Sequence, residues 1–101
     1  MQVSNAFEVF ASETPEYQKI WMETVQKLDK ASKLDKKTKE LAYLAVLSAM
    51  RLLSGIPFHT KMAKAYGATR EEIISSILVG LPAAGNQVIG ALPVALSAYD
   101  E

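Results

Sequence analysis

Apolar residues recur at intervals of three or four through most of the chain, the spacing of one face of a helix. No segment alternates apolar and polar residues as a half-buried strand does. Helices are expected over about residues 5–11, 15–31, 36–53, 56–66, 70–80 and 86–98, the last bent or broken at Pro93. The pattern predicts an all-α fold, a compact bundle of five or six helices in a single domain over residues 1–101.

Three expected helices begin at recognisable capping residues. Thr14 precedes Pro15, which suits the first position of a helix because the missing N–H has no partner there anyway. Asp35 can cap the helix that follows it. Thr69 and Glu72 have the spacing of a capping box, in which each side chain bonds the backbone N–H of the other residue. Ser54-Gly55 and Gly67 are the corresponding signals for the ends of the helices over 36–53 and 56–66.

The helix expected over 36–53 is apolar on almost every side, which predicts a central and fully buried helix. At 100° per residue, Glu40 and Arg51 fall on one stripe with Ser54. Glu40 and Arg51 are about 16 Å apart along the axis, so each needs its own partner or solvent. The alternatives are a solvent-facing acid at the helix start for Glu40 and an interface salt bridge for Arg51.

Composition and charge exclude several classes of site and partner. With 11 basic and 11 acidic residues the formal net charge is +0, and the lysines between Lys19 and Lys39 are interspersed with acids, so no nucleic-acid partner is expected. The absence of cysteine excludes thiolate metal sites and disulfides, and one histidine excludes a histidine-rich zinc site, so neither a metal nor a cofactor is predicted. The first residues lack the basic region of a secretory signal, so a cytoplasmic location is expected.

Residues 73–99 contain no charged side chain, a length that would suffice for a membrane span. Glycine and proline at Gly80, Pro82, Gly85 and Pro93 interrupt this segment, which favours two short buried helices and no membrane. Half of all residues are hydrophobic, more than a monomer of this size easily buries. We therefore expect a homo-oligomer.

The single histidine, His59, lies in the first turn of the helix expected over 56–66. The positive end of the helix dipole favours the neutral imidazole, which can accept a proton. A lone histidine is otherwise a packed residue with one satisfied nitrogen, and composition and spacing leave both interpretations open.

The segment "LDKKTKELAYLAVLSAMRLLSGIPFHTKMAKAYGATREEI" resembles the carboxymuconolactone decarboxylase and alkyl hydroperoxidase D family. The matching residues are Lys39-Glu40-Leu41, Leu44-Ala45, His59 and the stretch "AKAYGATREEI", with Gly85 and Ala95 later in the chain. The resemblance covers about residues 34–99 and includes the separation between Glu40 and His59. It implies an alkyl hydroperoxidase D-like helical bundle that assembles as a trimer or a hexamer.

The chain departs from the hydroperoxidase branch of this family at its redox motif. Leu52 and Gly55 stand where that branch has its two cysteines, and Ser54 stands where it often has a histidine. A dithiol peroxidase cannot work without these thiols. The resemblance therefore implies that only Glu40 and His59, the proton-handling pair, carry over.

The branch without redox chemistry implies a lyase-like enzyme that acts on a small organic acid or lactone by proton transfer. In that interpretation His59 transfers the proton, and Glu40 orients or polarises the imidazole of His59. From their positions alone, Arg51 and Ser54 are candidates for substrate binding, the first through a carboxylate and the second through a hydrogen bond. Two alternatives stay open: an inactive binding or scaffold protein, and an antioxidant protein that depends on an external thiol.

Overall fold

The structure, a computed structural model, describes residues 4–101. Its elements are α1 (Asn5–Glu13), α2 (Pro15–Ala31), α3 (Lys36–Ala49), η1 (Leu53–Gly55), α4 (Ile56–Ala65), α5 (Arg70–Leu78), α6 (Leu81–Ala84), η2 (Gly85–Gly90) and α7 (Ala91–Tyr99). No strand occurs within 4–101, and the all-α prediction is confirmed. The described residues form two compact units, 4–34 and 35–101, and the single-domain prediction stays a prediction.

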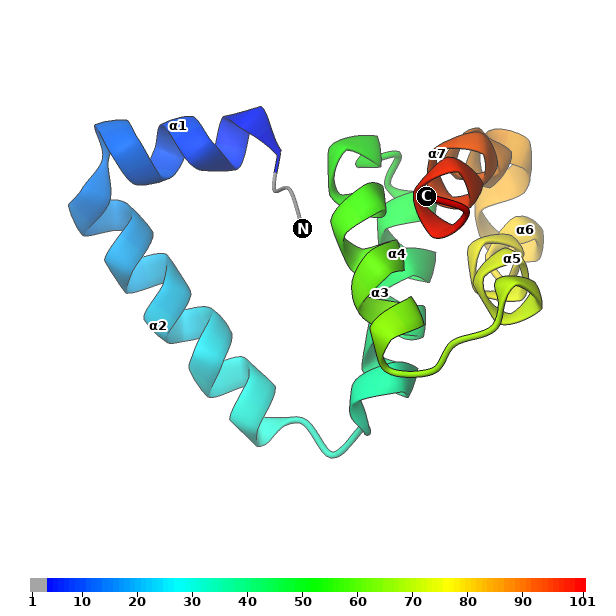
Figure 1. The fold of residues 1–101 in the computed structure, drawn as a ribbon, viewed down its shortest axis with the longest axis horizontal. Coiled ribbons are helices and arrows are strands. Elements are labelled where there is room, and N and C mark those ends of the chain that lie inside the picture. The colour runs from blue at the N-terminus through cyan, green and yellow to red at the C-terminus, as the bar shows by residue number, and fades with distance from the viewer. Residues whose placement is uncertain (1–3) are drawn as a thin grey trace. The chain divides into compact units, whose positions relative to one another are not determined.

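The smaller unit consists of α1 and α2, which contact each other (Figure 1). The Ser4 side chain caps α1 by accepting a hydrogen bond from the backbone N–H of Phe7 at 3.3 Å. Thr14 precedes α2 as expected, but its hydroxyl donates to the Phe10 carbonyl at 2.5 Å and does not cap α2. The predicted side-chain cap is wrong because the Thr14 hydroxyl bonds back to the Phe10 carbonyl one turn earlier, which also accepts the Thr14 backbone N–H.

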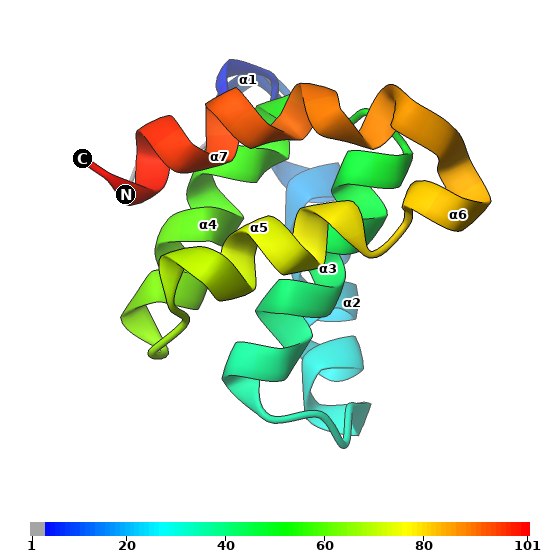
Figure 2. The ribbon, with the colours of Figure 1, turned by 90° about the vertical axis from the view of Figure 1, so that its right-hand side faces the viewer.

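The larger unit has its core where α3, α4, α5 and α7 meet (Figure 2). α4 packs against both α3 and α7, and α3 packs against α5. Small residues on α7, Ala91 and Ala95, are fully buried, so this helix can approach its neighbours closely. The core residues are Leu44, Leu47, Ile56, Ala63, Ala68, Ile73, Ile77, Ala91 and Ala95.

The helical stretch Arg70–Tyr99 is long and apolar enough, by length and composition, to cross a membrane. The structure divides it into four successive elements: α5, α6, η2 and α7. The last helix was expected over 86–98. In the structure α7 begins only at Ala91, and the residues before it, Gly85–Gly90, form the 3-10 helix η2. Pro93 consequently lies in the first turn of α7, where its missing N–H breaks no helical hydrogen bond.

The helix expected over 36–53 ends early, at Ala49. Two backbone bonds close it: Leu52 N–H donates to the Leu47 carbonyl at 2.9 Å, and Arg51 N–H donates to the Ser48 carbonyl at 3.2 Å. This is the bond pattern of a Schellman motif, which reverses the chain through one left-handed residue. Arg51 is that residue, with φ of 58°. This turn was not predictable from the residue types, because glycine is the usual residue at such a position.

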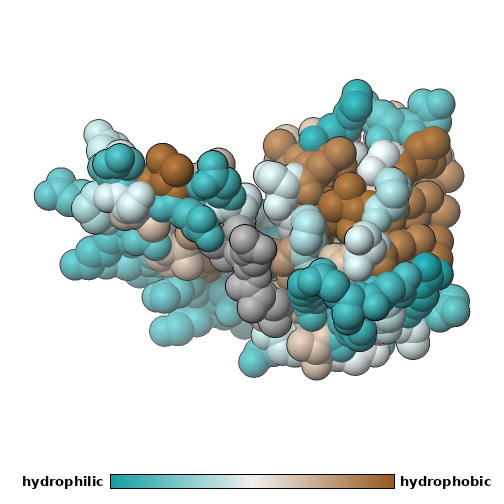
Figure 3. All heavy atoms as spheres, turned by 45° about the horizontal axis from the view of Figure 1, so that its top comes forward, coloured by the Kyte–Doolittle hydropathy of each residue, from teal (hydrophilic) through white to brown (hydrophobic). Residues whose placement is uncertain are grey.

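α3 is not buried on every side, contrary to the prediction from its composition. Tyr43 and Val46 are about half exposed and Met50, just after the helix, is 63% exposed, while Leu44 and Leu47 are buried. Hydrophobic residues at the molecular surface are visible in Figure 3. An apolar composition indicates that a helix face is buried, but it does not indicate whether the same chain or another chain buries it.

Candidate acid–base site

Glu40 and His59 meet across the interface between α3 and α4. The Nδ1 atom of His59 lies 2.7 Å from Oε2 of Glu40, and their side chains are 26% and 12% exposed. The two helices are held together by buried side chains on both, Leu44 and Leu47 of α3 and Ile56 of α4. The packing of the core therefore brings a carboxylate of the second turn of α3 to an imidazole of the first turn of α4.

The start of α4 also depends on a glycine. A Cβ atom on Gly55 would lie 3.3 Å from Cδ1 of Leu47 and 3.9 Å from Cδ2 of His59. The first of these contacts is tighter than ordinary van der Waals packing. Glycine at this position therefore allows the chain to pass close to α3 just before His59.

The contact with Glu40 occupies only one nitrogen of the imidazole. When Nδ1 carries hydrogen, it donates to the Glu40 carboxylate, and Nε2 is the free acceptor. Within residues 4–101, Nε2 makes no hydrogen bond, and it is not fully buried. The second nitrogen therefore keeps some exposure to solvent and is the one available for proton transfer.

Two aromatic rings flank the imidazole. The Tyr43 ring lies 4.4 Å from it, centroid to centroid, tilted by 57°, and the Phe58 ring lies 5.1 Å away, nearly perpendicular at 82°. Sequence reasoning missed Tyr43. Its position three residues after Glu40 is the signal that could have revealed it, because residues at that spacing share a face of a helix.

Arg51 and Ser54 are not joined to the acid–base pair. Both are exposed, and among the described residues no hydrogen bond or ion pair connects either of them with Glu40 or His59. They were expected on the Glu40 stripe, but α3 ends at Ala49, and the left-handed turn at Arg51 changes the direction of the chain. Their assignment to substrate binding stays a prediction.

Two surface hollows of the larger unit lie away from the pair. One, of about 540 Å³, lies between α3 and α5 and is lined mainly by small and apolar residues such as Leu41, Ala45 and Val79. The other, of about 600 Å³, is bounded by α4 and the end of the chain. Neither is lined by Glu40 or His59, so the pair lies at a partly open surface outside both hollows.

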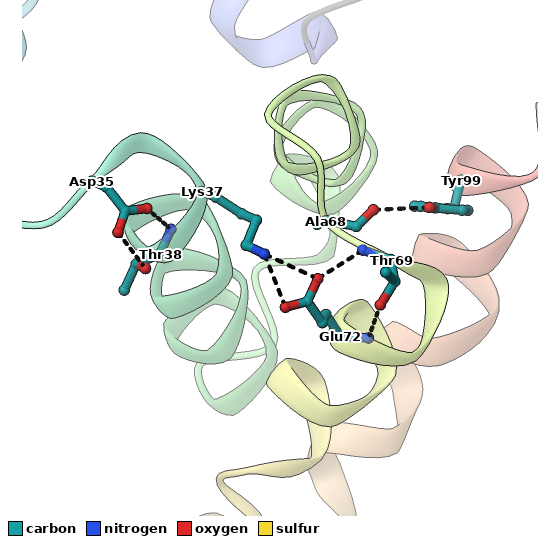
Figure 4. Close-up of polar contacts among 7 residues, drawn as sticks. All are labelled: Asp35, Lys37, Thr38, Ala68, Thr69, Glu72 and Tyr99. Carbon is teal, nitrogen blue, oxygen red and sulfur yellow. Dashed lines mark hydrogen bonds and ion pairs between the residues drawn. The ribbon is translucent and has the colours of Figure 1, made fainter.

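The start of α3 is tied to the start of α5 by a charged network (Figure 4). The Lys37 ammonium lies 3.1 Å from the Glu72 carboxylate, which also accepts the backbone N–H of Thr69 at 2.9 Å. The bond from the Thr69 backbone, followed by the one from Lys37, holds the pKa of Glu72 below its ordinary value. The predicted capping box is present, because the Thr69 hydroxyl accepts the N–H of Glu72 in return.

Metal binding has little support in the side chains of this region. Within residues 4–101, no three His, Cys, Asp or Glu side chains gather closely enough to hold an ion. The Glu40–His59 pair by itself offers one carboxylate and one imidazole, the components of proton transfer.

Comparisons with known proteins agree with this architecture. The model of the carboxymuconolactone decarboxylase family matches residues 15–97. The chain is also similar to a crystal structure from Legionella pneumophila, apo-lpg0406, a carboxymuconolactone decarboxylase family protein, with 29% identity and a TM-score of 0.79. That match covers 94% of this chain and 85% of the Legionella chain. A search of curated proteins gave no match.

Proposed function

Because the chain belongs to the carboxymuconolactone decarboxylase family, we propose that it is an acid–base enzyme that acts on a small organic acid or lactone. The observation that carries the proposal is the 2.7 Å contact between the Glu40 carboxylate and Nδ1 of His59. No cysteine occurs in the 101 residues, so the proposed chemistry is proton transfer without a thiol.

In the proposed reaction, a lactone acid loses its carboxyl group as carbon dioxide. The electron pair of the broken carbon–carbon bond moves into the unsaturated lactone, and Nε2 of His59, which has first taken up a proton from the solvent, delivers that proton to carbon. Water then returns a proton to the imidazole. Glu40 holds the hydrogen on Nδ1 and stabilises the charge that the ring carries before it gives up its proton, the role of a carboxylate behind a catalytic histidine.

Substrate contacts are proposed for two residues near the end of α3. An arginine can hold a carboxylate through two parallel hydrogen bonds, and Arg51 is exposed. Ser54, also exposed, can donate one more hydrogen bond. Both roles require the loop after Ala49 to lie beside the bound reactant.

Incubation with carboxymuconolactone in heavy water tests the proposal. We expect proton NMR to show loss of the carboxyl group and one deuterium at the newly protonated carbon. Glu40→Gln and His59→Ala should each lower turnover by at least about 100-fold, the usual contribution of an acid–base residue, and both should keep the helical circular dichroism spectrum. Glu71→Gln, on the exposed face of α5, is the control that should keep full activity.

Near wild-type turnover in either variant would remove that residue from the mechanism. An inactive scaffold is the competing function, favoured by the position of the pair outside both hollows. Failure of the wild-type chain to turn over carboxymuconolactone and a panel of related lactone acids would favour the scaffold. Peroxide consumption that requires an added thiol would instead indicate the antioxidant function.

A further inference from the structure

The imidazole of His59 has only one hydrogen bond to hold its orientation. Rotation about the bond that joins a histidine ring to its side chain has a broad, roughly two-fold profile. A half-turn would put Cδ2 where Nδ1 now meets Glu40 and would turn Nε2 toward a different place. The 2.7 Å contact with Glu40 is the one hydrogen bond within residues 4–101 that opposes this rotation, and the neighbouring Phe58 ring adds only an edge contact at 5.1 Å.

Tyr43 supplies a second contact with the same ring. Its ring centre lies 4.4 Å from that of His59, at the short limit of the separations usual for packed aromatic rings. Tyr43 and Glu40 are three residues apart on α3, so one rigid helix presents both a carboxylate and a ring to His59. In residues 4–101 the Tyr43 hydroxyl forms no hydrogen bond, and the ring itself is therefore the part that makes contact.

We propose that Tyr43 is a positioning residue for His59, whose ring fixes the imidazole rotation that directs Nδ1 to Glu40 and leaves Nε2 open. The residue is 46% exposed, too open to the solvent for a core role to explain its contact with the imidazole. The effect of Tyr43 on catalysis rests on the proposed function, whereas its effect on the ring is a property of the folded chain.

The chain has one histidine, so the imidazole protons can be assigned without ambiguity in an NMR spectrum. In the wild-type protein we expect nuclear Overhauser effects between the rings of Tyr43 and His59, with the imidazole protons displaced by the tyrosine ring current. Tyr43→Phe should keep both signals. Tyr43→Leu should lose the displacement. Val46→Ala, one turn further along the exposed side of α3, is the control that should leave the imidazole signals unchanged.

Activity on carboxymuconolactone gives a second and separate readout. We expect Tyr43→Leu to lower kcat about tenfold, as a small misplacement of a catalytic group does, with little change in KM, while Tyr43→Phe keeps kcat. Thermal melts of each variant establish that it is folded.

Several results would overturn the positioning role. They are the absence of the Overhauser effects in the wild-type protein, unchanged imidazole signals in Tyr43→Leu, and a Tyr43→Phe variant that behaves like the leucine variant. If the wild-type protein does not turn over the lactone, the proposed function fails, and the NMR signals still decide the role of Tyr43.

Discussion

Arg51 has a backbone conformation that glycine usually provides. Its φ of 58° is left-handed, and a side chain in that region costs about 1 kcal/mol because Cβ crowds the neighbouring carbonyl. The same residue closes α3 through its bond to the Ser48 carbonyl. A strained residue that carries an exposed cation favours a functional role for its side chain.

We expect Arg51→Gly to stabilise the fold. Relief of the left-handed strain should raise the free energy of unfolding by about 1 kcal/mol, offset in part by the greater freedom of glycine in the unfolded chain. Urea unfolding followed by circular dichroism measures the change. If Arg51 binds the substrate carboxylate, KM should rise in the same variant.

Arg51→Ala is the matched control, because alanine keeps the strain and removes only the guanidinium. It should raise KM as Arg51→Gly does, without the gain in stability. A stabilised glycine variant with unchanged KM would show that Arg51 has no part in substrate binding.

At the scale of elements, α3 and α5 are joined at their first turns by charge. The bond from the Thr69 backbone and the contact with Lys37 depress the pKa of Glu72, so ionised Glu72 favours the folded state. For a depressed carboxyl pKa the stabilisation is present above the unfolded value, ordinarily 4.5, and is lost as the pH falls through the folded value.

We expect Glu72→Gln to be less stable than the wild-type protein at pH 7 and to approach it in acid. In acid, Glu72 of the wild-type protein is protonated and its contribution to stability is lost. The glutamine variant never has this charge, so it has no such contribution to lose. Thermal melts of both proteins across the acid range measure the difference, with Glu71→Gln as control. If the difference in melting temperature between the two proteins stays constant with pH, the charge of Glu72 does not stabilise the fold.

Local chemistry predicted the beginnings of helices better than their ends. The capping box at Thr69 and Glu72 is present, and Asp35 accepts the N–H of Thr38 as a cap should. The end of α3 and the start of α7 differed from prediction. Caps depend on residues a few positions apart, whereas the end of α3 depends on a strained arginine that only the surrounding packing maintains.

At the scale of the whole molecule, many large hydrophobic side chains stay exposed. They include Val46 on α3 and Met50 directly after it. Contiguous apolar surface of this kind usually meets a partner. The proposed homo-oligomer, a trimer or a hexamer, would cover this surface. The cytoplasmic location stays a prediction.

Sedimentation at micromolar concentration tests the assembly. We expect the wild-type chain to sediment as a trimer or hexamer and Val46→Glu to dissociate, because the assembly would bury an unpaired charge. Asn86→Glu places the same charge on the exposed η2 and should leave the mass unchanged. A stable wild-type monomer would contradict the prediction.

The amino-acid sequence was sufficient to predict the helical class, most helix starts and the family, because these depend on periodicity, capping residues and residue spacing along the chain. It also indicated Glu40 and His59 together, through a resemblance and not through any distance. The packing of the helices was needed to show that the two side chains touch, that Tyr43 packs on the imidazole, and that Arg51 and Ser54 leave the stripe. These outcomes depend on how α3 meets α4, and that meeting is set by buried contacts between residues far apart in the chain.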